Sequence, residues 1–354
     1  MVSEYTDKVN QFRALLEQAK NECGGCEMML VVAGGGLGDQ VITSAIVSRL
    51  ADACNLRSCM ISPAAQRITH TNSAVEVLQG HPAGPVYASS CGLPRELLIA
   101  VACEAKVNVL DWRHVTMVYW KGEQPQNYAQ WARLYDGMPQ TLGELASWGV
   151  HFEEVFRMSS ELGALKQKDY YVNTADTPAS HIAFPYAVVH AEPAGLPNHK
   201  GFWWQAEALV STMKEAFPRL ALCQIGARHD RTLAGMIDQR GLSVPDTSLL
   251  IKRAALFIGC DSGPMYIAHA HCVPSILFFG PTHQSFFAWE ENLNLQYPTT
   301  NCPPCWFSGG DWHWECKIRS DHCVNMPHWE DEEVVKAIGE YTGRSLEAWE
   351  KQDQ

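Results

Sequence analysis

A glycine-rich loop that ends in an acid is the first stretch of this chain able to do chemistry. Residues 34–43 read GGGLGDQVIT and follow the apolar run MMLVVA. Asp39 stands where the dinucleotide fingerprint needs its last glycine, and no lysine follows as in the mononucleotide loop. Asp39 instead lies at the start of a helical pattern, where the helix dipole favours an ionised carboxylate. Two interpretations stay open: a helix cap, or a carboxylate base.

A second candidate site is a cysteine-rich segment, CPPCWFSGGDWHWECKIRSDHC, with the spacing C-x2-C-x10-C-x6-C. Its cysteines are Cys302, Cys305, Cys316 and Cys323. Two thiolates three residues apart on a tight turn bind one tetrahedral ion, and a second pair completes the site. The spacing favours structural zinc or iron, with reduced cysteines or disulfides as the alternatives. Four thiolates leave no open position, so we expect no catalytic divalent metal.

Short apolar runs alternate with amphipathic segments along the chain. The expected strands are 28–33, 57–62, 106–111, 116–120, 186–191, 221–226, 255–260 and 275–280. The expected helices are 4–21 and 41–54, with others starting near Trp203, His229, Thr247 and Pro264. Continuous apolar strands alternating with helices are typical of parallel sheets covered on both faces. The fold class expected is therefore α/β.

The chain divides at residues 169–185, which are polar, carry two prolines and lack periodicity. We expect one domain over 1–175 and a second over 185–354, the latter including the cysteine finger at 302–323. The second half has its own glycine loop after a strand, GCDSGPM at 259–265. Ligands of open α/β sheets bind at the carboxyl ends of strands, so the two loops are expected to face one another across a cleft.

Three stretches resemble the ADP-heptose:lipopolysaccharide heptosyltransferases, glycosyltransferases of the family 9 type. They are GLGDQVITSAIVSRL (36–50), HAEPAGLPNHKGFWWQAEALV (190–210) and LLIKRAALFIGCDSGPMYIAHAHCVPSILFFGPT (249–282). The third is the most specific, with its Asp-Ser-Gly-Pro signature and Phe-Gly-Pro-Thr ending. The resemblance implies the GT-B architecture, in which two Rossmann-like lobes face one another across a cleft.

The resemblance also implies roles for residues of these stretches. Asp39, on the loop with Gly36 and Gly38, is the base that deprotonates the acceptor hydroxyl, which makes residues 1–175 the acceptor-side domain. Lys200 neutralises the diphosphate of a nucleotide sugar in the C-terminal domain. Asp261, Ser262 and Gly263, with Pro264 and Met265, form the donor loop. Separately from the resemblance, residues 224–227 end a strand, so Gly226 is expected near the nucleotide base and Asp230 as an acceptor from the ribose. In chemical terms, glycosyl transfer needs a carboxylate on the acceptor side and cationic groups beside the leaving diphosphate.

Plainer interpretations of these residues stay open. Lys200 follows Asn198 and His199 in a loop, where a solvated lysine is ordinary, and Asp261 is placed to cap a helix. Ser262 and Gly263 fit turn chemistry. The family commonly has histidine two residues after the proline of its signature, whereas this chain has Tyr266. This departure puts the identity of the donor sugar in question.

The cysteine finger resembles that of the autotransporter heptosyltransferase branch. That resemblance implies a ferric ion held by the finger and assembly of the chain into homo-oligomeric rings. Four thiolates suit iron and zinc about equally.

Charge and composition narrow the partners. The chain has 354 residues, is 46% apolar and carries a net charge of −12, with no basic run to form the clustered cationic face that nucleic acid requires. The polar N-terminus does not read as a signal peptide, and no apolar run approaches the ~20 residues of a membrane span. We expect a cytoplasmic protein whose contact with the inner membrane is at most peripheral.

The predicted function is an inverting glycosyltransferase that moves a sugar, with heptose from ADP-heptose as first choice. Residues 1–180 carry 14 basic against 19 acidic side chains, a net −5, which favours a neutral glycan or a protein hydroxyl over a phosphorylated acceptor. The alternatives are a nucleotide-sugar epimerase of GT-B architecture and a degenerate, non-catalytic scaffold. The presence of both Asp39 and Lys200 counts against the scaffold.

Overall fold

The protein is described by a computed structural model that divides into two compact units. One comprises Met1–Asp136 with Glu153–Asn173, and the other Gly137–Phe152 with Thr174–Gln354. The residues that the structure describes are 5–22, 28–32, 36–54, 57–63, 73–82, 86–89, 93, 95–111, 117–119, 151–153, 165–178, 182, 185–194, 197–297, 302, 304–305, 316, 318–329 and 331–352.

The first unit is built on a five-stranded sheet in the order β3-β2-β1-β4-β5. Its strands are β1 (Met28–Val32), β2 (Arg57–Pro63), β3 (Val86–Ser89), β4 (Asn108–Asp111) and β5 (Met117–Tyr119). The first four are parallel, whereas β5 runs antiparallel to β4. The expectation of a parallel strand at 116–120 is wrong in direction, because the short β4–β5 connection cannot hold a parallel crossover.

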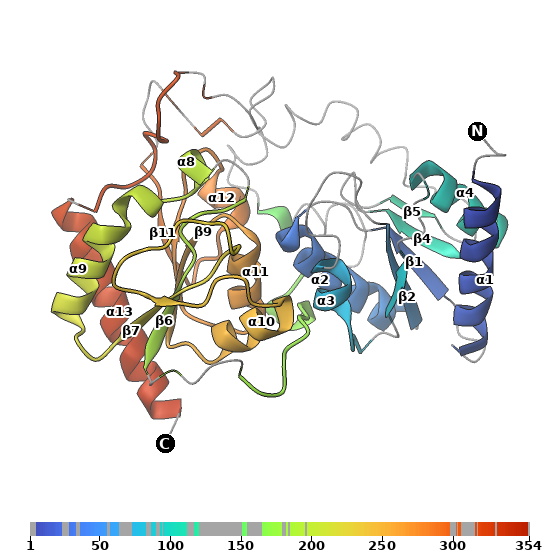
Figure 1. Ribbon diagram of the computed structural model, residues 1–354, viewed down its shortest axis with the longest axis horizontal. Coiled ribbons are helices and arrows are strands. Elements are labelled where there is room, and N and C mark those ends of the chain that lie inside the picture. The colour runs from blue at the N-terminus through green and yellow to red at the C-terminus, as the bar shows by residue number, and fades with distance from the viewer. Residues whose placement is uncertain are drawn as a thin grey trace. The chain divides into compact units, whose positions relative to one another are not determined.

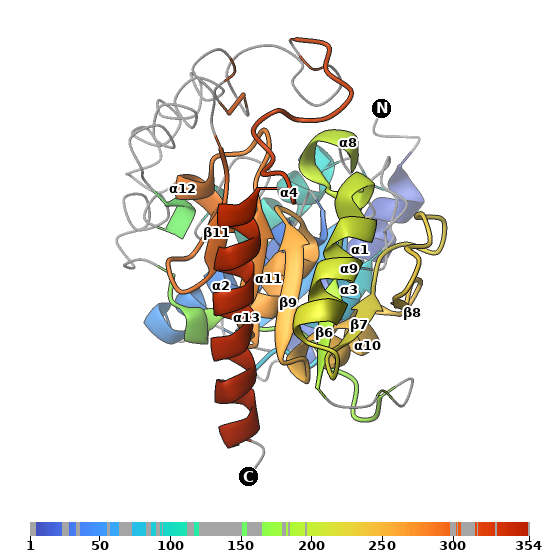
Figure 2. The same ribbon diagram turned by 90° about the vertical axis from the view of Figure 1, so that its left-hand side faces the viewer.

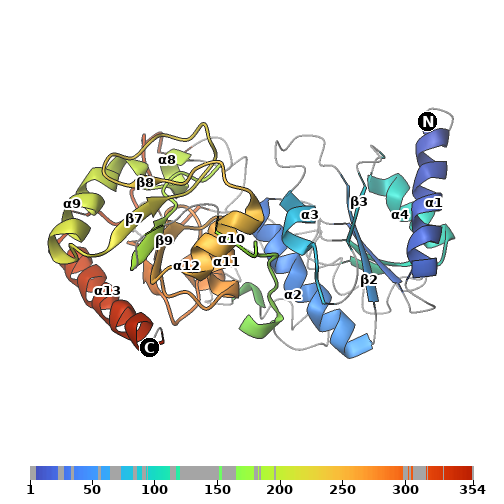
Figure 3. The same cartoon turned by 60° about the horizontal axis from the view of Figure 1, so that its bottom comes forward.

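Helices cover both faces of the first sheet (Figures 1 and 3). They are α1 (Thr6–Glu22), α2 (Leu37–Cys54), α3 (Ser73–Leu78) and α4 (Arg95–Glu104). On one face α1 and α4 share a core in which Phe12 and Leu16 meet Leu98 and Val101. On the other face α2 and α3 lie together. This layering explains why the helical pattern of the sequence has apolar residues at spacings of three and four.

The second unit carries a six-stranded, wholly parallel sheet in the order β11-β10-β9-β6-β7-β8. Its strands are β6 (Tyr186–Val189), β7 (Ala221–Gln224), β8 (Ile237–Asp238), β9 (Leu256–Cys260), β10 (Ser275–Phe278) and β11 (Leu293–Leu295). Counted from β6, this is the 3-2-1-4-5-6 order of the Rossmann fold read in reverse. The order switches between β6 and β9, so their carboxyl ends are where a ligand site is expected.

Two pairs of helices sandwich this sheet (Figures 1 and 2). On one face lie α9 (Ala206–Ala216) and α13 (Glu332–Gln352), and on the other α10 (Val244–Lys252) and α11 (Gly263–Ala270). Two single-turn helices, α8 (Pro197–Lys200) and α12 (Gln284–Phe287), lie in connections. No helix within the described ranges has the length and apolar character needed to cross a bilayer.

The helix expected near His229 does not form. Residues 225–243 make turns and the two-residue β8 instead. Three glycines in this stretch, Gly226, Gly235 and Gly241, have positive φ angles, a conformation that interrupts a right-handed helix. The amides of Gln239 and Gly241 donate to the carbonyls of Gln224 and Gly226, and a pattern of polar spacing does not reveal these contacts.

Candidate functional site

The carboxyl ends of β6 and β9 bring together two polar side chains at the switch point of the second sheet. His190 directly follows β6, and Ser262 follows β9. Nδ1 of His190 lies 2.9 Å from Oγ of Ser262, whose hydroxyl donates to the carbonyl of Cys260 at 3.1 Å. Burial lowers the pKa of His190 to about 4, so its ring is neutral near pH 7. A neutral Nδ1–H donating to Ser262 completes this chain of hydrogen bonds.

Lys200 and Asp261 form an ion pair beside the hydrogen bonds of His190 and Ser262. Nζ of Lys200 lies 2.8 Å from Oδ2 of Asp261, with the lysine side chain 18% and the aspartate side chain 7% exposed. The lysine comes from α8 and the aspartate from the turn between β9 and α11. A nearly buried carboxylate paired with a more exposed ammonium leaves the positive charge as the part that a ligand can reach.

Gly201 lets the Lys200 loop lie directly on the end of β6. A Cβ at this position would come within 2.4 Å of the Ala191 carbonyl oxygen and 2.5 Å of that of Pro197. The next amide, that of Phe202, donates to the Ala191 carbonyl at 3.0 Å. Only glycine permits this approach of two backbones, so main-chain packing fixes the chain directly after Lys200.

The start of α11 presents helix N-terminal amides at the same place. Ser262 is the N-cap residue, although its side chain makes no capping hydrogen bond because it is engaged with His190. Pro264 and Met265 are buried in the first turn, while Ser262 and Gly263 are half-buried. Unpaired amides and the helix dipole make such a terminus favourable for anions. Together with Lys200, it forms a positively polarised surface.

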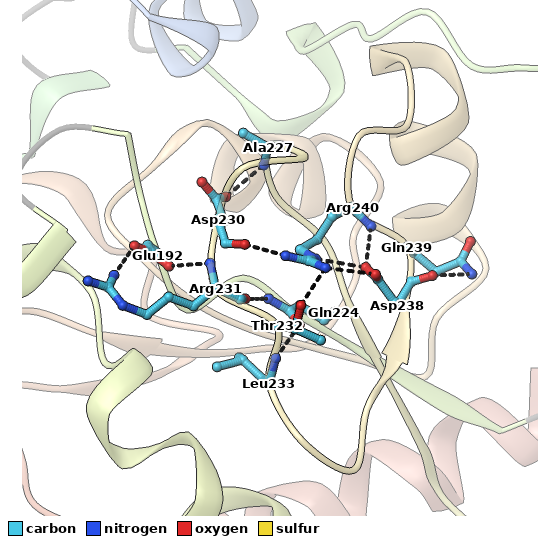
Figure 4. Close-up of polar contacts among 10 residues, drawn as sticks. All are labelled: Glu192, Gln224, Ala227, Asp230, Arg231, Thr232, Leu233, Asp238, Gln239 and Arg240. Atoms are coloured by element: carbon cyan, nitrogen blue, oxygen red, sulfur yellow. Dashed lines mark hydrogen bonds and ion pairs between the residues drawn. The ribbon is translucent and has the colours of Figure 1, made fainter.

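Gly226 and Asp230 follow β7, and Figure 4 shows how Asp230 closes its own loop. Oδ2 of Asp230 accepts from the amide of Ala227 at 2.6 Å. Gly226 has φ +146°, and a Cβ there would come within 2.3 Å of the same oxygen. Burial raises the pKa of Asp230. The structure thus gives Asp230 a loop-closing role, and its contact with a ribose stays a prediction.

Two arginines beside this loop, Arg231 and Arg240, were given no role from the sequence (Figure 4). Arg231 pairs through its guanidinium and its amide with Glu192, and the guanidinium lies 3.8 Å from the ring centroid of Trp203. Arg240 binds Asp238 at 2.8 Å, and this hydrogen bond lowers the pKa of Asp238 to about 2. Charged residues that flank an apolar strand were the available signal; Asp238 is near Arg240 in the chain, whereas Glu192 lies 39 residues from Arg231.

Asp39 lies in the first unit, at the third position of α2. Its Oδ2 accepts from the amide of Gly36 at 2.6 Å, the reciprocal half of a capping box. Thr43 donates to the Asp39 carbonyl at 2.7 Å one turn later. Gly36 is exposed, whereas Gly38 and Asp39 are half-buried. The helix therefore begins at Leu37, earlier than expected. One carboxylate oxygen of Asp39 has the capping role that the sequence suggested. The role of Asp39 as a base stays a prediction.

Tyr266 belongs to a buried aromatic cluster. It stands at the position where the heptosyltransferases that the sequence resembles commonly have histidine. It is 4% exposed. Its ring meets that of Trp289 edge-on at 5.5 Å and that of Phe152 at 6.0 Å. Packing therefore accounts for the aromatic residue at this position.

The four finger cysteines are all free thiols. Burial, together with the charges of Cys305, Cys302 and Cys316, raises the pKa of the Cys323 thiol to about 12. In the described part of the chain, however, no three His, Cys, Asp or Glu side chains are arranged to hold a metal ion. Trp306, Trp312 and Trp314, which belong to the finger, lie outside the described residues.

Comparisons with known proteins agree with this architecture. Residues 241–307 match the model of glycosyltransferase family 9 (heptosyltransferase). No curated protein sequence matches the chain. Among solved structures, the iron-containing dodecameric glycosyltransferase TibC of enterotoxigenic E. coli is similar at 16% identity and a TM-score of 0.54, over 93% of this chain and 77% of that one.

Two further solved structures are similar. E. coli ADP-heptose heptosyltransferase II matches at 11% identity and a TM-score of 0.54, over 90% of this chain and 99% of its own. A family 9 glycosyltransferase of Veillonella parvula matches at 15% identity and a TM-score of 0.50, over 90% and 97%. At such identities the likeness shows the fold. The expected α/β class and GT-B type of fold are confirmed, and among the described strands only β5 departs from the parallel sheets that were expected.

Proposed function

We propose that this chain, a heptosyltransferase-like glycosyltransferase of the family 9 type, transfers a sugar from a nucleotide-diphosphate donor to a hydroxyl group with inversion. ADP-heptose is the proposed donor, because the matching family is described as heptosyltransferase and TibC has been solved in complex with ADP-D-beta-D-heptose. The proposed acceptor is a hydroxyl of a glycan or of a protein.

The observation that carries the proposal is the Lys200–Asp261 pair beside the N-terminus of α11. A nucleotide diphosphate leaves the anomeric carbon with negative charge, and that charge must be stabilised as it develops. A lysine and helix amides fixed in place can do so without reorganising. In this proposal Lys200 faces the diphosphate, Asp261 fixes the ammonium, and Ser262 and Gly263 supply the amides.

Asp39 is the proposed general base. Its carboxylate takes the proton of the acceptor hydroxyl as that oxygen bonds to the anomeric carbon. The bond from that carbon to the diphosphate breaks, and ADP departs with the bonding electrons. The hydrogen bond from Gly36 supports this role, because it fixes one carboxylate oxygen and favours the ionised form at a helix N-terminus.

A structural iron or zinc ion at Cys302, Cys305, Cys316 and Cys323 is part of the proposal. Four free thiols in the spacing C-x2-C-x10-C-x6-C have the ligand chemistry of a tetrahedral site, and TibC is described as iron-containing. A bound ion would join the two cysteine pairs, and no step of the reaction passes through it. Elemental analysis of the full-length protein, with about one ion per chain expected, checks this assignment.

Assembly and location complete the proposal. TibC is described as dodecameric, and we propose that this chain also forms homo-oligomers, which sedimentation of the full-length protein would detect. A cytoplasmic protein that works at the inner membrane is the proposed setting, and cell fractionation tests it.

The experiment that tests the function combines binding with turnover. ADP should raise the melting temperature of the protein more than UDP or GDP at equal concentration. ADP-heptose should then be consumed rapidly only when an acceptor is present. Stronger protection by UDP or GDP contradicts the ADP assignment. Turnover of the nucleotide sugar without acceptor indicates an epimerase, and binding without any turnover indicates a scaffold.

A further inference from the structure

The loop that carries Lys200 has little support of its own. Its helical part, Pro197–Lys200, is a single turn closed by the amide of Gly201, which donates to the Pro197 carbonyl at 3.1 Å. An isolated turn is unstable in water because helix nucleation is unfavourable. The place of the Lys200 ammonium therefore depends on what packs against this loop.

His322, from the end of the cysteine finger, spans the loop. Its Nδ1 donates to the carbonyl of Asn198 at 3.4 Å, two residues before Lys200. Its ring stacks on that of Trp204, four residues after Lys200, with centroids 4.6 Å apart and planes inclined by 20°. One side chain thus contacts the loop on both sides of the lysine in sequence.

Two further contacts attach the same parts of the chain. Nε2 of His199 donates to the carbonyl of Ser320 at 3.0 Å. The buried amide of Gln205 donates to the carbonyl of Pro327 at 3.0 Å and accepts from the backbone amide of Trp329 at 2.7 Å. Several hydrogen bonds therefore join the segment 318–329 to the Lys200 loop and to the residues that follow it.

The Lys200 loop and the segment of Cys323 are closely packed where both meet Gly280. A Cβ on Gly280 would come within 2.2 Å of the His199 carbonyl oxygen and 3.1 Å of the Cβ of Cys323. Three chain segments thus meet at Gly280, which contacts both Cys323 and His199, the residue that precedes Lys200.

We propose that His322 is a positioning residue of the donor site, which holds the Lys200 loop so that the ammonium meets the diphosphate. This inference rests on the proposed role of Lys200. A charge displaced by about 1 Å stabilises a developing anion much less, so loosening the loop weakens nucleotide binding. His322 touches no substrate in this account and acts only through Lys200.

The test measures the dissociation constant of ADP for the full-length protein by calorimetry. His322→Ala should weaken ADP binding about fivefold, the loss associated with one hydrogen bond. His322→Asn retains a donor at the position of Nδ1 and should recover most of the affinity. Val324→Ala, an exposed position on the same segment, is the matched control and should bind like wild type. His322→Phe, which keeps the stack and removes only the donor, replaces His322→Ala if that variant does not fold.

A double-mutant cycle separates this inference from the function it rests on. Lys200→Ala should weaken ADP binding strongly, and adding His322→Ala to it should change nothing further. If Lys200→Ala binds ADP like wild type, the proposed function and this inference both fail. If Lys200→Ala is impaired while His322→Ala has no effect, or has the same effect with and without Lys200, only the positioning role is overturned.

Discussion

Asp39 and Lys200 are fixed by partners of different kinds, and this difference sets what a substitution would do to each. The Asp39 carboxylate is held by a backbone amide, that of Gly36, at 2.6 Å. The Lys200 ammonium is held by the side chain of Asp261 at 2.8 Å. The Gly36 amide belongs to the backbone and stays in place. The Asp261 carboxylate, in contrast, can share the Lys200 ammonium with an incoming diphosphate.

Asp39→Asn tests the base without disturbing the loop. The asparagine carbonyl still accepts from Gly36, so α2 should keep its start, but the amide cannot take a proton. We expect turnover to fall more than 100-fold while the melting temperature and the affinity for ADP stay close to wild type. Near-normal turnover would remove Asp39 from the mechanism. Asp39→Ala should in addition cost about 0.5–2 kcal/mol of stability through the lost cap.

His190 offers a neutral hydrogen-bond donor at the switch point. Burial lowers its pKa to about 4, so it does not titrate across the range in which most enzymes work. Its contact with Ser262 therefore holds the start of α11 in the same way from mildly acidic to alkaline pH.

At the scale of elements, the donor side depends on how closely α8 and its connection approach β6. Phe202 follows Gly201 into the core beneath α9, where its ring packs against that of Phe278, with centroids 4.7 Å apart and planes tilted by 35°. The backbone of Gly201 and the side chain of Phe202 thus anchor the chain directly after Lys200.

Two glycine substitutions separate close packing from conformational freedom. Gly201→Ala should destabilise the protein by about 1–3 kcal/mol, because its Cβ meets two backbone oxygens within 2.5 Å and neither can move freely. Gly339→Ala, in the interior of α13 with no atom within 4 Å of the added Cβ, should stabilise by about 0.5–1 kcal/mol. Urea unfolding of both variants checks this pair. Equal effects would mean that the approach of the Lys200 loop to β6 is looser than described.

At the scale of the whole molecule, buried histidines make stability depend on pH. Burial is the main reason that the pKa values of His81, His151, His190 and His271 fall from 6.5 to about 4. Between these values the unfolded chain binds protons that the folded chain does not. The stability contributed by the neutral rings is therefore complete above about pH 6.5 and is lost as the pH falls towards 4.

Calorimetric melting at pH 7.5 and pH 5.0 measures this effect. We expect the melting temperature to fall by at least about 5 °C at the lower pH. His190→Asn should reduce the pH dependence, since one titrating group is removed. His229→Ala, at a side chain that is 85% exposed, should leave the dependence unchanged. A melting temperature that is the same at both pH values would contradict the burial of these rings.

The sequence by itself determined eight of the eleven described strands, missing β3, β8 and β11, and it determined the α/β class. Apolar runs such as those of β6 and β9 are local signals, and Asp39, Lys200 and Asp261 sit on motifs whose spacing is local too. Lys200 and Asp261 come to the same edge of the second sheet because the carboxyl ends of parallel strands share that edge.

Only the tertiary structure decided which groups pair. The partner of Lys200 is Asp261 and that of His190 is Ser262, each more than 60 residues away. His322 could not be found from the sequence, because its contacts with Asn198 and Trp204 join segments more than 110 residues apart. Periodicity reports which face of an element is buried, whereas the choice of partner depends on how the whole chain packs.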